Sequence, residues 1–358
     1  FFTFQSMSYT IDLYRGNIEV QKNPITFAAF VTLFPQIVAG PIVRYEDVAA
    51  ELKERHLDLD TIWHGILRFC AGIGKKVLIA NNIGTLWDSV KVMDINTVPV
   101  ATAWLGIAAY TLQIYFDFSG YSDMAIGLGE MLGFHFPENF NYPYMSKSIS
   151  EFWRRWHMTL SEWFKSYVYF PLGGSRKGFG RTIFNTAVVW LLTGIWHGAS
   201  WNFITWGVMY GILIIIEKLL ITLLKKKNKE YILDKIPGFI KHIYAMLFVM
   251  LGWVLFDTKD LPTAFSYMKR MFSFGSTFAD EHTLYFLMNF GLLFMIAIIG
   301  CTSLVKNLAQ KFTAKVPSCS HVLSVVYMIV IMLIATSYLV DASYNPFLYF
   351  TFSGVRIC

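Results

Sequence analysis

The most informative segment of the sequence is Thr182–Ile216, which reads TIFNTAVVWLLTGIWHGASWNFITWGVMYGILIII. Its 35 residues include no Asp, Glu, Lys or Arg. A membrane-spanning helix needs about 20 mostly apolar residues. The stretch is therefore long enough for a hairpin of two short spans, and we expect the turn near His197–Trp201.

The composition of the whole chain also indicates a membrane protein. Of the 358 residues, 55% are hydrophobic and 15% are charged, whereas a soluble domain is about 45–50% apolar and about 25% charged. So few charges cannot cover a surface that faces water, which argues against a soluble enzyme, a disordered linker and a nucleic-acid-binding protein. The net charge of +6 is better explained by basic cytoplasmic loops.

Other uncharged segments predict further helices in the membrane. Three segments are long enough for a full span, namely Ile95–Phe116, Thr283–Val305 and Val316–Val340. His242–Phe256 is marginal, and Asn23–Val43 contains three prolines that predict a broken or re-entrant helix. Leu57–Asn82 is predicted to be a mixed helix with Lys75 and Lys76 in apolar surroundings. We expect about seven to nine segments that cross or enter the membrane, in one all-α domain over residues 1–358.

The charges of the connecting loops predict an orientation. Lys225–Lys241 carries six lysines and two acidic residues, while Asp257–Glu281 has a net charge of −1. Lys306–Lys315 and Arg176–Arg181 are again basic. Since cytoplasmic loops are enriched in Lys and Arg, we expect the three basic segments to be cytoplasmic.

The densest group of polar residues lies between Tyr115 and Lys177. Within it, Ser150–Lys165 is predicted to form one continuous amphipathic helix at the membrane interface, because apolar residues recur at helical spacing and charged residues fall mostly opposite. Its apolar face, continued to residue 167, consists of Phe152, Trp153, Trp156, Leu160, Trp163, Phe164 and Tyr167. His157 lies on this face, either as a satisfied core histidine or as a functional imidazole in a pocket.

Three acidic residues follow the predicted span that ends at Phe116. These residues are Asp117, Asp123 and Glu130. We expect them to pair with the region of Arg154 and Arg155 or to line a polar passage.

His197 is the one strongly ionisable side chain in the uncharged stretch Thr182–Ile216. Ionisable groups inside a membrane are costly and mark functional sites by default. Gly194, Gly198 and Ala199 flank the histidine and leave room for another helix or a ligand. The imidazole is either a structural residue bonded to a carbonyl or a general base that takes a proton from a hydroxyl near neutral pH.

Several other kinds of chemistry lack support in the sequence. The chain has no G-x-S-x-G or HExxH motif and no paired cysteine ligands, so that neither a serine triad nor a metal site is expected. Cys70, Cys301, Cys319 and Cys358 are interpreted as reduced apolar residues. The remaining histidines lie in loops or near span ends and are interpreted as surface or structural residues; they are His56, His64, His135, His242, His282 and His321.

Taken together, these motifs resemble the membrane-bound O-acyltransferase family. The strongest matches are FNYPYMSKSISEFWRRWHMTLSEWFKSYVYFPLGG at Phe140–Gly174 and LTGIWHGASW at Leu192–Trp201. Further matches are Phe1–Gly16, Phe34–Arg44, Gln113–Gly133 and the ending Asn345–Phe350. The likeness is greatest to the bacterial branch of alginate O-acetylases and next to the teichoic acid D-alanyl transfer proteins. Members usually begin with several more helices, so the chain is expected to lack some amino-terminal ones.

The resemblance implies a helical bundle with re-entrant and interfacial helices around a tunnel through a bacterial plasma membrane. It implies that His197 is the catalytic histidine and that His157 is the second histidine of this branch, which orients or polarises the acyl donor. Ser161 and Asn202 are candidates to stabilise the oxyanion. The implied donor is acetyl-CoA or another acyl thioester, with no bound cofactor. The implied partners are a polysaccharide acceptor and an extracytoplasmic esterase-like transferase.

Two alternatives remain open. Within the enzymes, the chain would transfer D-alanine to teichoic acid instead of acetyl groups to a polysaccharide. In a different class, it would be a transporter or channel that uses the two histidines as a relay, although no inverted repeat supports this alternative.

Overall fold

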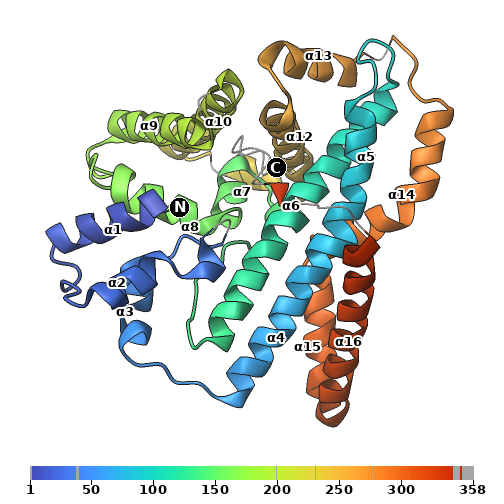
Figure 1. Cartoon of the computed structure of the whole chain (residues 1–358). Helices are drawn as coiled ribbons and strands as arrows, with labels where there is room; N and C mark the ends of the chain where they lie inside the picture. The colour runs from blue at the N-terminus through green and yellow to red at the C-terminus, as the bar shows by residue number, and fades with distance from the viewer. Residues whose placement is uncertain are drawn as a thin grey trace.

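The computed structural model describes residues 2–37, 40–198, 200–229, 231–273, 275–341 and 347–348. All the longer regular elements in these ranges are helical (Figure 1). The elements before the central helix are α1 Phe2–Tyr14, α2 Pro24–Val31, η1 Phe34–Gln36, α3 Tyr45–Lys53, α4 Leu59–Ile73, η2 Gly74–Ala80 and α5 Asn81–Lys91. The central helix and its successors are α6 Val100–Met131, η3 Pro143–Met145, α7 Ile149–Arg155, α8 Met158–Phe164, η4 Lys165–Tyr169 and α9 Phe179–His197. The chain continues with α10 Trp201–Lys226, α11 Tyr231–Lys235, α12 Gly238–Asp257, α13 Leu261–Met271, α14 Glu281–Gly300, α15 Leu304–Lys315 and α16 Pro317–Asp341.

The predicted helical hairpin is present, although of its two helices α10 is apolar enough to cross a membrane and α9 is not. α9 ends at His197 and α10 begins at Trp201, so the turn lies where the sequence predicts it. The two helices approach closely, because a Cβ atom added at Gly194 would lie 2.6 Å from the carbonyl oxygen of Phe203 and one at Gly207 would lie 2.5 Å from that of Trp190. Of the two uses predicted for Gly194, the close approach of a second helix is the one that the structure shows.

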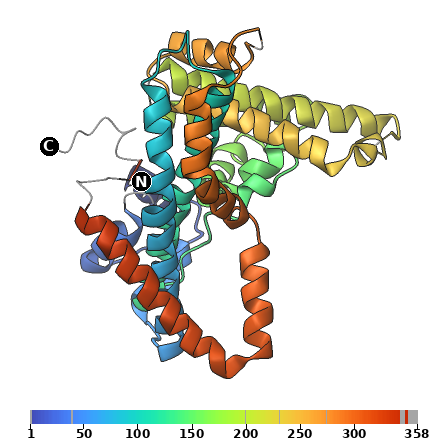
Figure 2. The ribbon, with the colours of Figure 1, turned by 90° about the vertical axis from the view of Figure 1, so that its right-hand side faces the viewer.

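Within the described residues, four helices are long and apolar enough to cross a membrane, namely α10, α12, α14 and α16. Figure 2 shows α10 and α12 side by side, projecting from the rest of the molecule. The prediction of a broken helix over Asn23–Val43 is confirmed, since α2 ends at Val31 and η1 follows it.

The prediction of a simple span over Ile95–Phe116 is wrong. α6 begins at Val100 and continues to Met131, and it is not among the four apolar helices. A central helix that is covered by protein can carry more polar residues than one that faces lipid. Most of α6 is buried in this way, from Val100 at its start to Glu130 at its end.

α4 and α6 lie against each other along most of their length (Figure 1). Glycines make this contact possible at two levels. A Cβ atom at Gly72 would lie 2.6 Å from the carbonyl oxygen of Gly120, and one at Gly127 would lie 2.5 Å from that of Gly65. Small residues at a helix interface let backbones approach in this way.

Ion pairs join the same two segments. Lys76 Nζ lies 2.5 Å from Asp117 Oδ1, and Lys75 Nζ lies 2.5 Å from Asp123 Oδ2. Both lysines belong to the π-helix η2, which continues α4. Arg68 also bonds Asp123, at 3.1 Å.

The partners predicted for the three acidic residues of α6 are therefore wrong, although ion pairing itself is confirmed. Glu130 Oε2 lies 2.7 Å from His64 Nδ1 on α4, while Arg155 bonds Glu151 on its own helix at 2.9 Å. The acidic residues point toward α4 and η2 because α4 packs on that face of α6.

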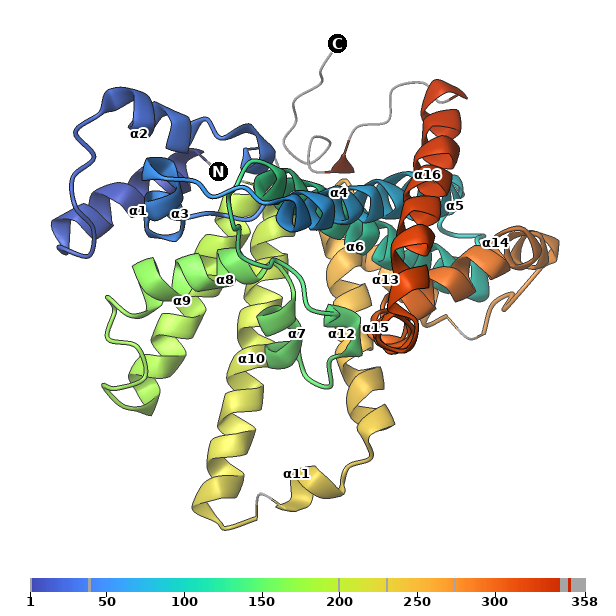
Figure 3. The ribbon, with the colours of Figure 1, turned by 90° about the horizontal axis from the view of Figure 1, so that it is seen from below.

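The start of α9 and the connection through α11, which carry two of the basic segments, lie in the lower part of Figure 3, while α15 lies nearer the middle of that view. A common cytoplasmic side for the three segments therefore stays a prediction.

We expect the substitution Gly127→Val to lower the melting temperature of the purified chain. The added side chain would overlap the backbone of Gly65 and Phe69 on α4, and such overpacking costs about 1–3 kcal/mol. The matched control is Gly291→Val in α14, where a Cβ atom meets nothing within 4 Å. Equal melting temperatures for both variants in detergent would contradict the proposed role of the α4–α6 contact.

Candidate active site

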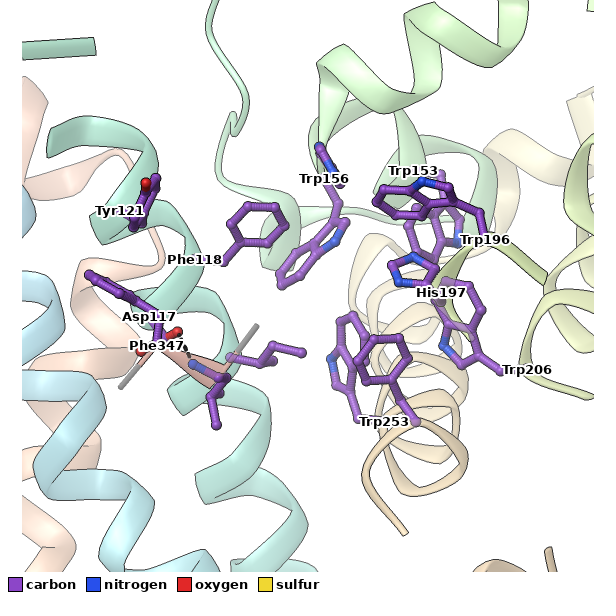
Figure 4. Close-up of a pocket in the computed structure, with 14 residues that line it drawn as sticks. Asp117, Phe118, Tyr121, Trp153, Trp156, Trp196, His197, Trp206, Trp253 and Phe347 are labelled. Atoms are coloured by element: carbon purple, nitrogen blue, oxygen red, sulfur yellow. Dashed lines mark hydrogen bonds between the residues drawn. The ribbon is translucent and has the colours of Figure 1, made fainter. Parts of the chain in front are cut away.

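A cavity with a volume of about 190 Å³ lies where α6, the α7–α8 junction, α9, α10 and α12 meet (Figure 4). Both histidines singled out in the sequence line it. The other lining residues are mostly aromatic: Phe118, Tyr121, Trp153, Trp156, Trp196, Trp206, Trp253, Phe256 and Phe347, with Ile114, Asp117 and Leu348. The structure thus brings His157 and His197 to one cavity, as functional roles for both would require.

His197 is the last residue of α9. Its ring makes edge contacts with Trp196, Trp206 and Phe256 at centroid distances of 4.6, 5.0 and 5.2 Å. Gly198 faces the ring of Phe203, and Ala199 lies outside the described residues. The helix end and the aromatic residues around it therefore place the imidazole at the cavity.

The region around His157 is not the single helix predicted over Ser150–Lys165. α7 ends at Arg155 and α8 begins at Met158, with His157 between them in a left-handed conformation at φ 44°. All seven residues of the predicted apolar face are nevertheless buried. The periodic pattern identified the buried residues correctly, but it could not show the break between the two helices.

Hydrogen bonds to the side chain of Asn139 hold this break. Asn139 Oδ1 lies 3.3 Å from the backbone nitrogen of Thr159, 2.9 Å from Thr159 Oγ1 and 3.0 Å from His157 Nδ1. The backbone nitrogen of Met158 also donates to the carbonyl oxygen of Asn139, at 2.9 Å. Asn139 was not identified from the sequence, where it stands in a turn-prone run and has no catalytic motif around it.

The same bonds determine the tautomer of His157. A backbone N–H can only donate, so the Asn139 atom that faces Thr159 is the oxygen, and His157 Nδ1 must carry a hydrogen to bond it. The neutral ring then has its lone pair on Nε2, which has no partner among the described residues. Burial, and to a smaller extent the charge of His197, hold the pKa of His157 well below its ordinary value, which favours this neutral form.

Trp196 links the two imidazoles. Its ring lies 4.6 Å from that of His197 and 6.3 Å from that of His157, measured between centroids. Among the hydrogen bonds between described side chains, none joins either histidine to a carboxylate. The site therefore differs from a histidine–aspartate pair in which a carboxylate stabilises the imidazolium.

Asp117 contributes a carboxylate to the cavity lining, but the partners of this carboxylate are not the histidines. Its Oδ1 pairs with Lys76, and its Oδ2 accepts a hydrogen bond of 3.0 Å from the backbone nitrogen of Leu348. Leu348 and Phe347 are the described residues of the predicted terminal motif Asn345–Phe350, and the others lie outside the described ranges. The lysine offsets the negative charge, so the cavity is close to neutral.

The predicted oxyanion donors are not in the cavity. Ser161 Oγ donates to the carbonyl oxygen of Trp153 at 3.1 Å, and Asn202 Nδ2 donates to that of Thr258 at 2.6 Å. Both side chains are therefore engaged in holding helix ends together, and this prediction is wrong.

The remaining predicted structural residues lie away from the cavity. His64 and His135 pair with Glu130 and Glu51, and His242 bonds the carbonyl oxygen of Ser146. Cys70 and Cys301 are buried and free. Across the described part of the chain, no group of three or more His, Cys, Asp or Glu residues is arranged to hold a metal ion.

Fold and site together define a helical membrane protein with two imidazoles in an aromatic cavity. The model of the MBOAT, membrane-bound O-acyltransferase family, matches residues 18–255, and the chain belongs to this family.

Three curated relatives show which members of the family the chain is similar to. The chain is 45% identical over 278 residues to the Azotobacter vinelandii protein named "Probable alginate O-acetylase AlgI", covering 77% of this chain and 53% of that protein. It is 35% identical to the peptidoglycan O-acetyltransferase of Helicobacter pylori, covering 76% and 55%. It is 29% identical to the teichoic acid D-alanyltransferase of Bacillus subtilis, covering 64% and 60%. The chain thus spans about half the length of the O-acetylating relatives that it matches.

We expect Asn139→Leu to destabilise the chain by about 1–3 kcal/mol, because the donors of His157 and Thr159 would lose their buried acceptor. The control is Asn141→Leu, two residues away, whose side chain is exposed. Denaturation of both variants in detergent measures the difference. If the two variants unfold alike, the side chain of Asn139 does not hold the α7–α8 junction.

Proposed function

We propose that the chain is the acyl-transferring part of a membrane O-acetyltransferase that modifies an exported or cell-envelope polysaccharide. The observation that carries the proposal is the meeting of His157 and His197 at one aromatic cavity. Support also comes from the two O-acetylating relatives, which are more similar to this chain than the D-alanyltransferase.

In the proposed reaction, His197 acts as the general base. It takes the proton of an acceptor hydroxyl, whose oxygen forms a bond to the carbonyl carbon of an acyl thioester. The carbon–sulfur bond then breaks, and the imidazolium returns its proton to the departing thiolate. Acetyl-CoA is the proposed donor, and the aromatic walls would exclude water that could hydrolyse the thioester.

The proposed role of His157 is narrower than the one expected from the sequence. With Nδ1–H bonded to Asn139, the neutral ring can accept a hydrogen bond at Nε2 but cannot donate one there. We therefore propose that it orients the donor by accepting a hydrogen bond. Polarisation of the thioester carbonyl would require the imidazolium, which burial disfavours.

In this proposal, indole N–H groups rather than His157 polarise the carbonyl group of the thioester. Among the described side chains that line the cavity, Trp153 and Trp206 have indole N–H groups without a partner. These groups replace Ser161 and Asn202 as candidate donors to the carbonyl oxygen.

His197→Ala is expected to reduce acylation of the envelope by about 10²–10⁴-fold, the usual contribution of a general base. His157→Ala should also reduce it, whereas the exposed His321→Ala should not. Mass spectrometry of envelope polymers from complemented deletion strains measures both acetyl and D-alanyl groups. Wild-type acylation by both cavity variants would refute the catalytic proposal, and loss of D-alanyl groups alone would select the alternative substrate.

The proposed setting is the bacterial plasma membrane, with the basic segments inside and an esterase-like transferase as partner outside. In a background without native cysteines, Lys229→Cys should be protected from a membrane-impermeant maleimide in intact cells. Lys259→Cys should react, because it belongs to the acidic connection on the other side. The reverse pattern would overturn the orientation.

A further inference from the structure

A second cavity, separate from the histidines, forms a groove between α12 and α14. Its volume is about 620 Å³, and residues of α6, including Thr111 and Leu112, form its floor. The walls come from Met246 and Met250 of α12 and Ile298 of α14. Both wall helices pack on α6 and diverge from each other (Figure 2). Both are apolar enough to lie in a membrane, so that we expect the groove to face the hydrocarbon of the bilayer.

The length of the groove matches one leaflet of the bilayer. The groove extends along α12 from Gly238 to Met250, about 18 Å at 1.5 Å per residue. Half of a hydrocarbon core of about 30 Å is about 15 Å. A lipid acyl chain therefore fits the groove lengthwise, with its headgroup at one end of it.

The end of the groove at Gly238 is positively charged. Lys147 lines the groove there, and its Nζ would lie 3.4 Å from a Cβ atom at Gly238. Glu151, which accepts a hydrogen bond from the backbone of Lys147, is paired with Arg155 at 2.9 Å. Among the described residues, the Lys147 ammonium group has no carboxylate partner. Lys241 lies on α12, three residues after Gly238.

We propose that this groove binds a phospholipid with an anionic headgroup. The acyl chain lies between α12 and α14, and the phosphate meets Lys147 at the end predicted to be cytoplasmic. Basic pockets between membrane helices select anionic lipids in this way. The site does not depend on the proposed acyl transfer, although Tyr144 in its wall bonds Trp253, which lines the histidine cavity.

The test is native mass spectrometry of the full chain released from nanodiscs of phosphatidylcholine and phosphatidylglycerol at three to one. The wild-type chain should retain phosphatidylglycerol about fivefold or more above its share of the bilayer. Lys147→Glu should abolish this enrichment without unfolding the chain, since the side chain is exposed. Met246→Trp, which fills the groove, should reduce retention of both lipids.

The matched control is Lys177→Glu, an exposed lysine of the same predicted side that does not line the groove. It should retain the wild-type enrichment. No enrichment in the wild-type chain, or equal enrichment in the Lys147 variant, would overturn the proposal. So would a wild-type dimer without lipid that Met246→Trp separates into monomers, because the occupant would then be a second copy of the chain.

Discussion

The close contact between α4 and α6 holds the central helix of the protein in place. Glycines bring the two backbones together, and this approach puts Lys75 and Lys76 within reach of the carboxylates of Asp123 and Asp117. Removing one member of a buried ion pair costs about 3–5 kcal/mol, because the other charge is left without compensation. The helix positions and the charges therefore depend on each other, and α6 cannot rotate without separating them.

The fixed position of α6 determines the cavity. Ile114, Asp117, Phe118 and Tyr121 of this helix form one wall, and Phe118 lies 4.9 Å from the His157 ring, measured between centroids. The opposite wall is made by the ends of α9 and α12 and the start of α10. Short helices and helix ends thus present the functional side chains, while the long central helix keeps them in place.

The sequence predicted the parts of this arrangement that depend on local composition. The uncharged stretch gave the α9–α10 hairpin, and its single ionisable residue directed attention to His197. The apolar period also identified the buried residues around Trp153 and Trp163, because burial follows periodicity whether or not the helix is continuous.

What the sequence could not predict depends on neighbours distant in the chain. The break before Met158 is held by the side chain of Asn139, and a left-handed histidine has no local signature beyond a modest preference. From the sequence, Asp117 and Asp123 are predicted to pair with the region of Arg154 and Arg155 or to line a polar passage. The helix that faces α6 decides the pairing instead, and only the tertiary structure shows which helix that is.

The pairing has a chemical consequence at the cavity. A free carboxylate at Asp117 would favour the imidazolium forms of the nearby histidines, since an opposite charge stabilises the charged state. Lys76 offsets that carboxylate, and aromatic rings supply most of the remaining wall. Burial favours the neutral form of the His157 ring, and Asn139 determines which of its nitrogens can accept a hydrogen bond. The ion pair that fixes α6 thus also offsets the carboxylate that Asp117 contributes to the cavity lining.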